Sequence, residues 1–377
     1  MIEVQDIFRQ HGKEYLKNHT LNLVQFKAYQ DILRCRTSAL GGHVDVCNEC
    51  GFQRNSYNSC RNRHCPKCQT LAKERWIENQ EQSLLNTGYF HVVFTLPDAL
   101  NPVAYQNQKV IYDLFFKAVS ETLLELGLDK KYLGAKLGIT AVLHTWGQNL
   151  MYHPHIHCVV PGGGLTIDGK WIYSRKKFFI PVKILSKKFR GKFMAFMRTA
   201  ELRFNGSIGH LNLPEKYNSF IADLYKSNWI TYCKPPFGNA AKVVEYLGRY
   251  THRVAISNNR ILKLGDGKVT FRWRDYADHN KVKQLTVTSG EFIRRFLMHV
   301  LPPGFRKIRH YGILASRDKS KRIAMCKKLT RTPARNAKPL RGTLEILTDM
   351  FGDQFNLCPR CGTGHLTRDG PPPKAIA

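Results

Sequence analysis

The sequence predicts a chain of mixed α-helices and β-strands that follows a metal-binding segment near the amino terminus. From residue 89 to about residue 301, short strand-like runs alternate with longer helical segments such as 110–128. Residues 35–68 are rich in Cys, His and Asn and have little apolar content. Between Gly304 and Gly342 there are thirteen Lys or Arg residues and one Asp. These changes in composition divide the chain into four parts, 1–34, 35–85, 86–302 and 303–377.

The first part has the apolar spacing of helices, from Ile7 and Phe8 to Ile32 and Leu33. We therefore expect a helical segment over residues 1–34, ahead of the cysteines.

The charge of the chain indicates a polyanionic partner. The net charge is +31, from 59 Lys and Arg against 28 Asp and Glu, and such a field attracts nucleic acid. No stretch approaches the roughly 18 apolar residues of a membrane span, and the opening MIEVQDIFRQHGKEY lacks the apolar centre of a signal peptide. We expect a cytoplasmic protein that binds DNA and has no membrane partner.

Eleven cysteines, many of them in CxxC pairs, predict metal sites rather than disulfides. In CNECGFQRNSYNSCRNRHCPKCQ, Cys47 and Cys50 form one pair, and Cys65 and Cys68 form another. Two such turns can complete a closed tetrahedral site, which is typical of structural zinc. A segment so poor in apolar residues would take much of its stability from the metal.

Other metal ligands remain in the sequence. A second zinc site would use Cys35, His43, Cys60 and His64, which lie in the same segment. Cys358 and Cys361 form half a zinc knuckle near the carboxyl terminus, with His365 as the nearest further ligand. Four basic residues around the knuckles indicate either DNA contact or a solvated face: Arg54, Arg61, Arg63 and Lys67.

The segment HPHIHCVVPGGG places histidines at positions 153, 155 and 157. In a strand, residues two apart share one face, so the three imidazoles would project the same way. Neutral imidazole is the commonest metal ligand. The spacing therefore favours a metal site over a polar strand.

Strands and a helix surround this segment in the sequence. Val92, Phe94 and Leu96 alternate in a strand that Pro97 ends, and GITAVLHTWGQNLMYHPHIH predicts two strands joined by a turn near 149–152. Further on, Tyr246 and Tyr250 are i and i+4 in a predicted helix, about 6 Å apart along its axis. Core packing alone explains two tyrosines at that spacing.

The order of these motifs is similar to that of HUH endonucleases, which cut single-stranded DNA. FTLP, HTWGQ, HPHIH, EYLGRYTHR and EFIRRFLMHVLPPGFRKIRHYG, behind a cysteine-rich segment, resemble the two-tyrosine rolling-circle transposases of the insertion sequence ninety-one family. The resemblance extends from about Cys35 to Cys361. It implies an α+β fold, in which an antiparallel-sheet HUH core carries metal ligands on a central strand and tyrosines on a facing helix, with a zinc-binding domain before it and a basic extension after it.

The resemblance also implies the chemistry. His155 and His157 would hold Mg²⁺ or Mn²⁺ with Gln148 as the third ligand, and His153 and His144 are alternatives to Gln148. Tyr246 and Tyr250 would attack the scissile phosphates at the two ends of a mobile element and form 5′-phosphotyrosine links, with Arg249 and Arg253 assisting. Rolling-circle transposition of single-stranded DNA is the implied function.

Three alternatives use fewer of these motifs. A rolling-circle replication initiator or relaxase shares the core chemistry but not the zinc segment. A zinc metallohydrolase would use His153, His155 and His157 and leave the tyrosines without a role. A non-catalytic zinc-ribbon DNA-binding protein needs only residues 35–68 and the basic surface.

Overall fold

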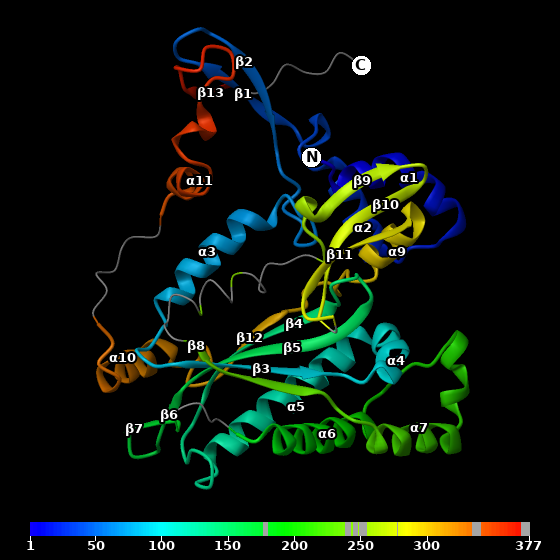
Figure 1. Cartoon of the computed structure of the whole chain (residues 1–377), viewed down its shortest axis with the longest axis vertical. Coiled ribbons are helices and arrows are strands. Elements are labelled where there is room, and N and C mark those ends of the chain that lie inside the picture. The colour runs from blue at the N-terminus through cyan, green and yellow to red at the C-terminus, as the bar shows by residue number, and fades with distance from the viewer. Residues whose placement is uncertain are drawn as a thin grey trace.

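The computed structural model describes residues 1–175, 180–237, 243, 248, 255–276, 278–333 and 341–370 of the 377-residue chain. Its elements form a central sheet, a smaller sheet packed on helices, and a ribbon at one end (Figure 1).

The central sheet has five antiparallel strands in the order β12–β4–β5–β3–β8. The strands are β3 (Tyr89–Thr95), β4 (Gly138–Trp146), β5 (Tyr152–Pro161), β8 (Thr231–Phe237) and β12 (Ile308–Gly312). The predicted mixed class with an antiparallel sheet is confirmed. The predicted turn before the histidine strand is also confirmed, because it joins β4 to β5. β12 lies beyond residue 302, so one edge strand comes from the predicted basic extension. Its sequence, IRHYG, has too few apolar residues to indicate a strand.

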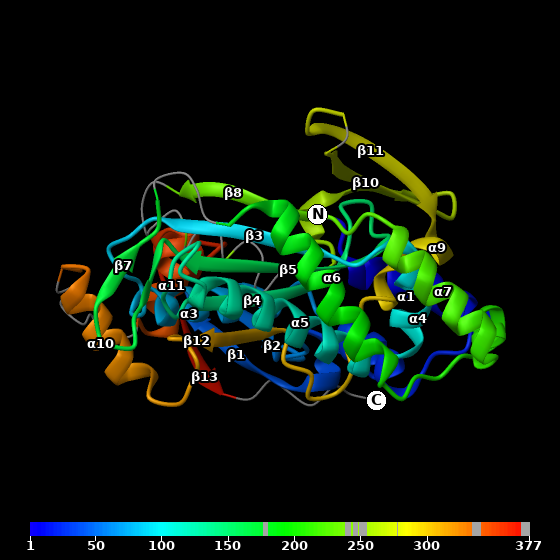
Figure 2. The same ribbon diagram turned by 90° about the horizontal axis from the view of Figure 1, so that it is seen from below.

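Helices cover one face of this sheet, and in Figure 2 the two longest lie across its strands. They are α4 (Asn101–Gln106), α5 (Gln108–Leu128), α6 (Val182–Arg198) and α7 (Pro214–Lys226). Alternate strand residues such as Phe94 and Ile156 point to these helices and join one apolar core with Phe115 and Phe189. The Phe189 ring lies 5.1 Å from that of Phe94 and 5.5 Å from that of Phe115. Each such buried ring contributes about 2–3 kcal/mol relative to an exposed one. We call this side of the sheet the helix face.

The opposite side of the sheet, which we call the histidine face, is partly covered by α3 (Gln69–Glu81). Trp76 of α3 packs against a cluster of Tyr89, Val159 and Val243. α3 has no fully buried residue and little amphipathic character, as expected for a helix that connects two parts of a molecule.

A second unit combines the amino-terminal helices with residues 261–297. α1 (Val4–Asn18), α2 (Leu23–Arg34) and α9 (Ser289–Leu297) pack on a three-stranded sheet of β9 (Ile261–Gly265), β10 (Lys268–Asp275) and β11 (Lys281–Thr288). Asn22 caps α2, accepting hydrogen bonds from the amides of Val24 and Gln25. Both helices of residues 1–34 share their core with Phe271 and Phe292 of the later segment.

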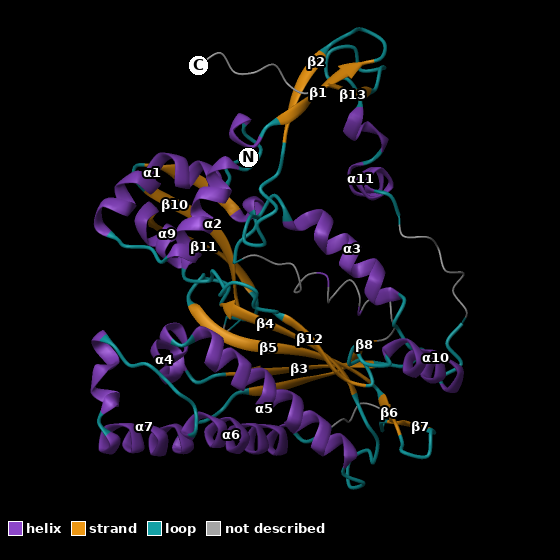
Figure 3. Ribbon diagram, turned by 180° about the vertical axis from the view of Figure 1, so that it is seen from behind, coloured by secondary structure: helices purple, strands orange, loops and turns teal. Residues whose placement is uncertain are grey.

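The ribbon at the far end is a sheet in the order β13–β1–β2. Its strands are β1 (Gly42–Cys47), β2 (Gln53–Tyr57) and β13 (Leu366–Gly370). Two helices lie between the central sheet and β13 in sequence, α10 (Lys319–Leu329) and α11 (Thr343–Phe351), and Figure 3 shows α11 next to the ribbon. A small hairpin of β6 (Gly163–Leu165) and β7 (Trp171–Tyr173) follows β5. Among the described residues no helix is long and apolar enough to cross a membrane.

Candidate active site and metal centres

Three imidazoles meet on the histidine face of the central sheet. His155 and His157 come from β5, and His144 comes from β4, directly opposite His155. One ring nitrogen of each lies within 4.8 Å of the others. Strand alternation directs His155 and His157 to one face, and the β4–β5 register adds His144. The three groups can therefore hold one cation.

Hydrogen bonds orient these rings. His155 Nδ1 lies 2.7 Å from the backbone oxygen of His153, so Nδ1–H donates there and Nε2 keeps its lone pair. His157 Nδ1 lies 2.8 Å from Nε2 of His91 on β3. Burial lowers the pKa of His155 to about 4 and that of His91 to about 3. Both imidazoles are thus neutral near pH 7, and neutral imidazole is the form that binds metal.

His91 is a site residue that sequence reasoning missed. It pairs with Val159 in the β3–β5 register, two residues from His157 on the same face. Its position in FHVVFT indicates only a buried strand, and the register between strands is what identifies it.

The three candidates for the third ligand of the histidine site have different surroundings. The Gln148 amide donates to the Tyr276 hydroxyl at 2.9 Å, because the chain leaves β4 at Trp146 and Gln148 lies in the following turn. His153 Nδ1 lies 3.7 Å from Asp98 Oδ1 instead of joining the cluster. His144, which the sequence left as an alternative, lies with His155 and His157.

The predicted nucleophiles Tyr246 and Tyr250, and the predicted helpers Arg249 and Arg253, lie outside the described residues. Two residues of the same segment are described. Val243 is buried against Tyr89 and Val159, and β-carbon placement at Gly248 would bring that atom 2.3 Å from Ile77 Cδ1 of α3. At these two positions, the segment touches the histidine face and α3.

One cysteine cluster joins the end of α2 to the start of α3. Cys35, Cys60, Cys65 and Cys68 bring their sulfur atoms within 4.8 Å of one another. Cys35 directly follows α2 and Cys68 directly precedes α3.

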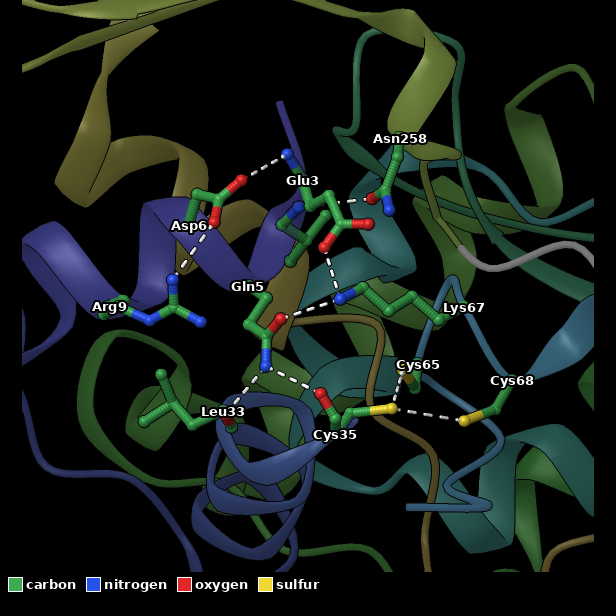
Figure 4. Close-up of polar contacts among 11 residues, drawn as sticks. Glu3, Gln5, Asp6, Arg9, Leu33, Cys35, Cys65, Lys67, Cys68 and Asn258 are labelled. Atoms are coloured by element: carbon green, nitrogen blue, oxygen red, sulfur yellow. Dashed lines mark hydrogen bonds and ion pairs between the residues drawn. The ribbon is translucent and has the colours of Figure 1, made fainter. Parts of the chain in front are cut away.

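α1 supports this cluster, as Figure 4 shows. The Gln5 amide donates to the backbone oxygens of Cys35, at 2.9 Å, and Leu33, at 2.8 Å. Lys67 donates to Gln5 Oε1 at 2.8 Å and pairs with Glu3. Lys67, expected near DNA, therefore fixes the cluster to α1.

The second cluster overturns the predicted grouping of the cysteines. Cys47 and Cys50 lie with Cys358 and Cys361, while Cys65 and Cys68 lie with Cys35 and Cys60. The two CxxC pairs predicted to share an ion thus belong to different clusters. The physical reason is that β13 returns along β1 and delivers the last pair to the first, a pairing that local spacing does not contain.

The histidines predicted for a second zinc site have other partners. His43 Nε2 lies 3.1 Å from Asp45 Oδ1, and His64 Nε2 accepts from the amide of Leu301 at 3.3 Å. His365, named with the last cysteine pair, places Nδ1 3.1 Å from Asn356 Oδ1. None of these three belongs to a cysteine cluster among the described residues.

Like Lys67, two more of the basic residues predicted to contact DNA have partners within the protein. Arg63 donates to the backbone oxygen of Pro302 at 2.7 Å and to that of Phe305. It therefore connects the loop between Cys60 and Cys65 to the loop that follows α9. Arg54 pairs with Asp45. Arg61 is exposed and stays a candidate for DNA contact.

Comparison with known proteins identifies the family. A family of transposase zinc-binding domains matches residues 7–96, and a family described as "Putative transposase" matches residues 138–322. The "Putative transposase y4qJ" of Sinorhizobium fredii (strain NBRC 101917 / NGR234) is 46% identical over 376 residues, covering 97% of this chain and 94% of that one. The chain belongs to the insertion sequence ninety-one family of transposases.

A second relative agrees with this assignment. The transposase for insertion sequence element IS801 of Pseudomonas savastanoi pv. phaseolicola is 28% identical over 309 residues, covering 80% of this transposase and 73% of that one. No solved structure matches the chain. The zinc-binding match contains the whole first cluster, and the donor set of four cysteines fits structural zinc. Cys358 and Cys361 lie outside both matched ranges.

Proposed function

We propose that this transposase cuts and rejoins single-stranded DNA at the ends of its mobile element by HUH chemistry and so drives rolling-circle transposition. The observation that carries the proposal is the cluster of His144, His155 and His157 on the histidine face of the central sheet. Val243 contacts this same face. Val243 lies three residues before Tyr246 in the sequence, and we therefore expect the two tyrosines to reach the same face.

The imidazoles would act on the scissile phosphate through a bound divalent cation. When bound, Mn²⁺ or Mg²⁺ supplies stabilisation for the charge that develops on the phosphate. His155 and His157 are oriented for this by His153 and His91. Imidazole nitrogens suit transition metals better than Mg²⁺, so we expect Mn²⁺ to support cleavage at the lower concentration.

The tyrosines would carry the covalent step. The hydroxyl of Tyr246 or Tyr250 forms a bond to phosphorus and loses its proton, and the bond from phosphorus to the 3′ oxygen breaks. The products are a 5′-phosphotyrosine and a free 3′-OH. Attack by a 3′-OH on that phosphotyrosine reverses the exchange and joins DNA without ATP. Two tyrosines permit one exchange at each end of the element.

A covalent adduct tests this function. A 3′-labelled single-stranded oligonucleotide that spans an element end should become attached to the full-length protein when Mn²⁺ is present, and EDTA should prevent it. Tyr246→Phe with Tyr250→Phe should abolish the adduct while DNA binding persists. An adduct that survives in the double variant would refute the assignment of the nucleophiles.

Tyr232 on β8 provides the matched control. It is 48% exposed and stands opposite Val93, which stands opposite His157, so it also lies on the histidine face. Tyr232→Phe should leave the adduct at its wild-type yield. Loss of the adduct in Tyr232→Phe alone would transfer the nucleophile to β8.

Wild-type protein that binds the oligonucleotide but forms no adduct would favour the zinc-ribbon DNA-binding alternative.

A further inference from the structure

The second cysteine cluster is built from both ends of the chain. Cys47 Sγ lies 3.8 Å from Cys361 Sγ, and Cys50 Sγ lies 3.6 Å from Cys358 Sγ, a residue 308 positions away. A disulfide would hold its sulfur atoms about 2.0 Å apart. Four sulfurs at about 2.3 Å from a zinc ion define a tetrahedron with edges of about 3.8 Å. The observed distances match the zinc tetrahedron.

The backbone around these cysteines has the same arrangement at both ends. The amides of Glu49 and Cys50 point to Cys47 Sγ at 3.4 and 3.5 Å. The amide of Arg360 points to Cys358 Sγ at 3.4 Å, and that of Gly364 to Cys361 Sγ at 3.3 Å. Amide donors favour the thiolate form that binds metal. A side chain at position 364 would also place its β-carbon 2.4 Å from Cys47 Sγ, so the turn is fitted to the first pair.

β-sheet pairing aligns the two halves independently of the sulfur atoms. β13 pairs with β1, and Leu366 stands opposite Cys47. The amide of Asn48 donates to the His365 backbone oxygen at 3.1 Å, and the amide of His365 donates to Asn48 Oδ1 at 2.7 Å. The carboxy-terminal segment is therefore a strand of the amino-terminal ribbon.

We propose that Cys47, Cys50, Cys358 and Cys361 bind a second structural zinc ion. This zinc site, which we call the clasp, fixes the carboxy-terminal segment to the ribbon and thereby holds α11 against α3. The part of this proposal that concerns α3 rests on the proposed function, because Ile77 of α3 faces Gly248, which lies between Tyr246 and Tyr250 in the sequence. The zinc site itself does not depend on that function.

Contacts between α11 and α3 connect the clasp to the histidine face. Arg341, just before α11, pairs with Glu78 of α3 and Asp349 of α11, and Arg75 of α3 donates to the Thr343 hydroxyl. Ile77, on the same helix, is the residue that faces Gly248. The amino end of α3 follows Cys68 of the first cluster. Each zinc would thus fix a different part of α3.

Zinc content of the full-length protein tests the clasp. A parent chain carrying His155→Ala and His157→Ala prevents the histidine site from adding zinc to the count. We expect two equivalents in this parent, and one equivalent after Cys358→Ser with Cys361→Ser. Adding Cys47→Ser to that variant should remove no further zinc, because all three cysteines serve one ion. Cys60→Ser in place of these changes should remove the other ion, and Cys233→Ser, outside both clusters, should remove neither.

Two equivalents retained without Cys358 and Cys361, or a further equivalent lost with Cys47→Ser, would overturn the proposal. X-ray absorption at the zinc edge of the parent chain gives an answer even if a variant does not fold. It should show four sulfur ligands per zinc at about 2.3 Å and no nitrogen. One equivalent of zinc in the parent chain, or nitrogen ligands, would also overturn it.

The adduct assay tests the connection to α3, in a chain with intact histidines. Cys358→Ser with Cys361→Ser should lower adduct yield at least several-fold, while a Mn²⁺ titration still detects the histidine site. An unchanged yield would refute the role of the clasp in holding α3. If the wild-type protein forms no adduct, the proposed function fails, and the zinc count still decides the clasp.

Discussion

His144 and Gln148 are four positions apart in the sequence, yet the structure gives them different partners. His144 stands opposite His155 within the β4–β5 register, and its ring centroid lies 4.6 Å from that of His157. Gln148 donates to Tyr276. A ligand must share both the face and the level of the other ligands, and the β4–β5 register gives His144 both.

Substitution of His144, His91 and Gln148 separates their roles in metal binding. His144→Ala should abolish Mn²⁺-dependent cleavage and weaken Mn²⁺ binding by more than 100-fold. His91→Ala removes only the partner of His157 Nδ1, and losing such an orienting group typically costs roughly 10- to 100-fold in metal affinity. Gln148→Ala should keep wild-type affinity. Mn²⁺ titration followed by electron paramagnetic resonance measures all three, and a larger loss for Gln148→Ala than for His144→Ala would restore Gln148 as the ligand.

The sequence predicts the arrangement of residues within one β-strand better than contacts between neighbouring β-strands. Period two places His155 and His157 on one face, and the apolar alternation before Pro97 locates β3. The cysteine grouping predicted from the spacing is wrong, because it assigns CxxC pairs that are close in sequence to one ion. The pairing of β1 with β13 instead brings Cys361 next to Cys47. His91 is missed for the same reason, since its contact with His157 depends on the register between β3 and β5.

At the scale of elements, α3 packs closely against Gly248. A β-carbon at position 248 would lie 2.3 Å from Ile77 Cδ1 and 2.9 Å from Ile77 Cγ1. Gly248→Ala should therefore lower the free energy of unfolding by about 1 kcal/mol or more, as overpacked substitutions do. Ile77→Ala in the same chain should recover part of that loss, because it removes the atoms in the way.

Gly191 of α6 is the control for this pair. A β-carbon there meets no atom within 4 Å, so Gly191→Ala should stabilise the protein by about 0.5–1 kcal/mol through helix propensity. Urea unfolding of the four proteins measures the differences. A loss at position 248 that is unchanged by Ile77→Ala would show that α3 is not what constrains this segment.

The sheet of β9, β10 and β11 has one basic outer side. Arg272 and Arg274 are exposed and alternate with Phe271, which is buried against Phe292. Figure 2 shows β10 and β11 extending away from the rest of the molecule. Among the aromatic residues of β10 and the turn after it, Tyr276 is 61% exposed, whereas Phe271 belongs to the core. We expect this side of the sheet to contact DNA.

Salt dependence tests that surface. Each phosphate contact with single-stranded DNA contributes about 0.7 to the slope of log affinity against log salt. Arg272→Ala with Arg274→Ala should reduce the slope by about 1.4 if both arginines contact phosphate. Lys183→Ala with Lys216→Ala changes two exposed lysines on the helices of the helix face and should leave the slope unchanged. Equal effects of the two pairs would indicate diffuse attraction by the net charge alone.

At the scale of the whole molecule, buried histidines make stability depend on pH. Burial lowers the pKa of His64 and His91 to about 3, and that of His155, His299 and His310 to about 4. In the unfolded chain these groups titrate near 6.5. Between pH 6.5 and 4 the unfolded state therefore binds more protons than the folded state, so stability falls as pH falls.

Each of these histidines should cost about 1 kcal/mol of stability between pH 6.5 and 5.5. Urea unfolding at the two pH values measures the sum, and a zinc assay at pH 5.5 shows whether the cysteine clusters keep their metal. A free energy of unfolding that is equal at both pH values, with zinc retained, would contradict the burial of these groups as neutral imidazoles.

The pairing of β1 with β13 has a consequence for synthesis of the protein on the ribosome. Cys50 and Cys358 are 308 residues apart, so at about 5–20 residues per second roughly 15 to 60 s pass between their appearances. During that time β1 has β2 on one side and an open edge on the other, and Cys47 and Cys50 have no second pair. A chain that terminates before residue 358 never acquires that strand. The ribbon is consequently completed only in a transposase that has been translated through residue 370.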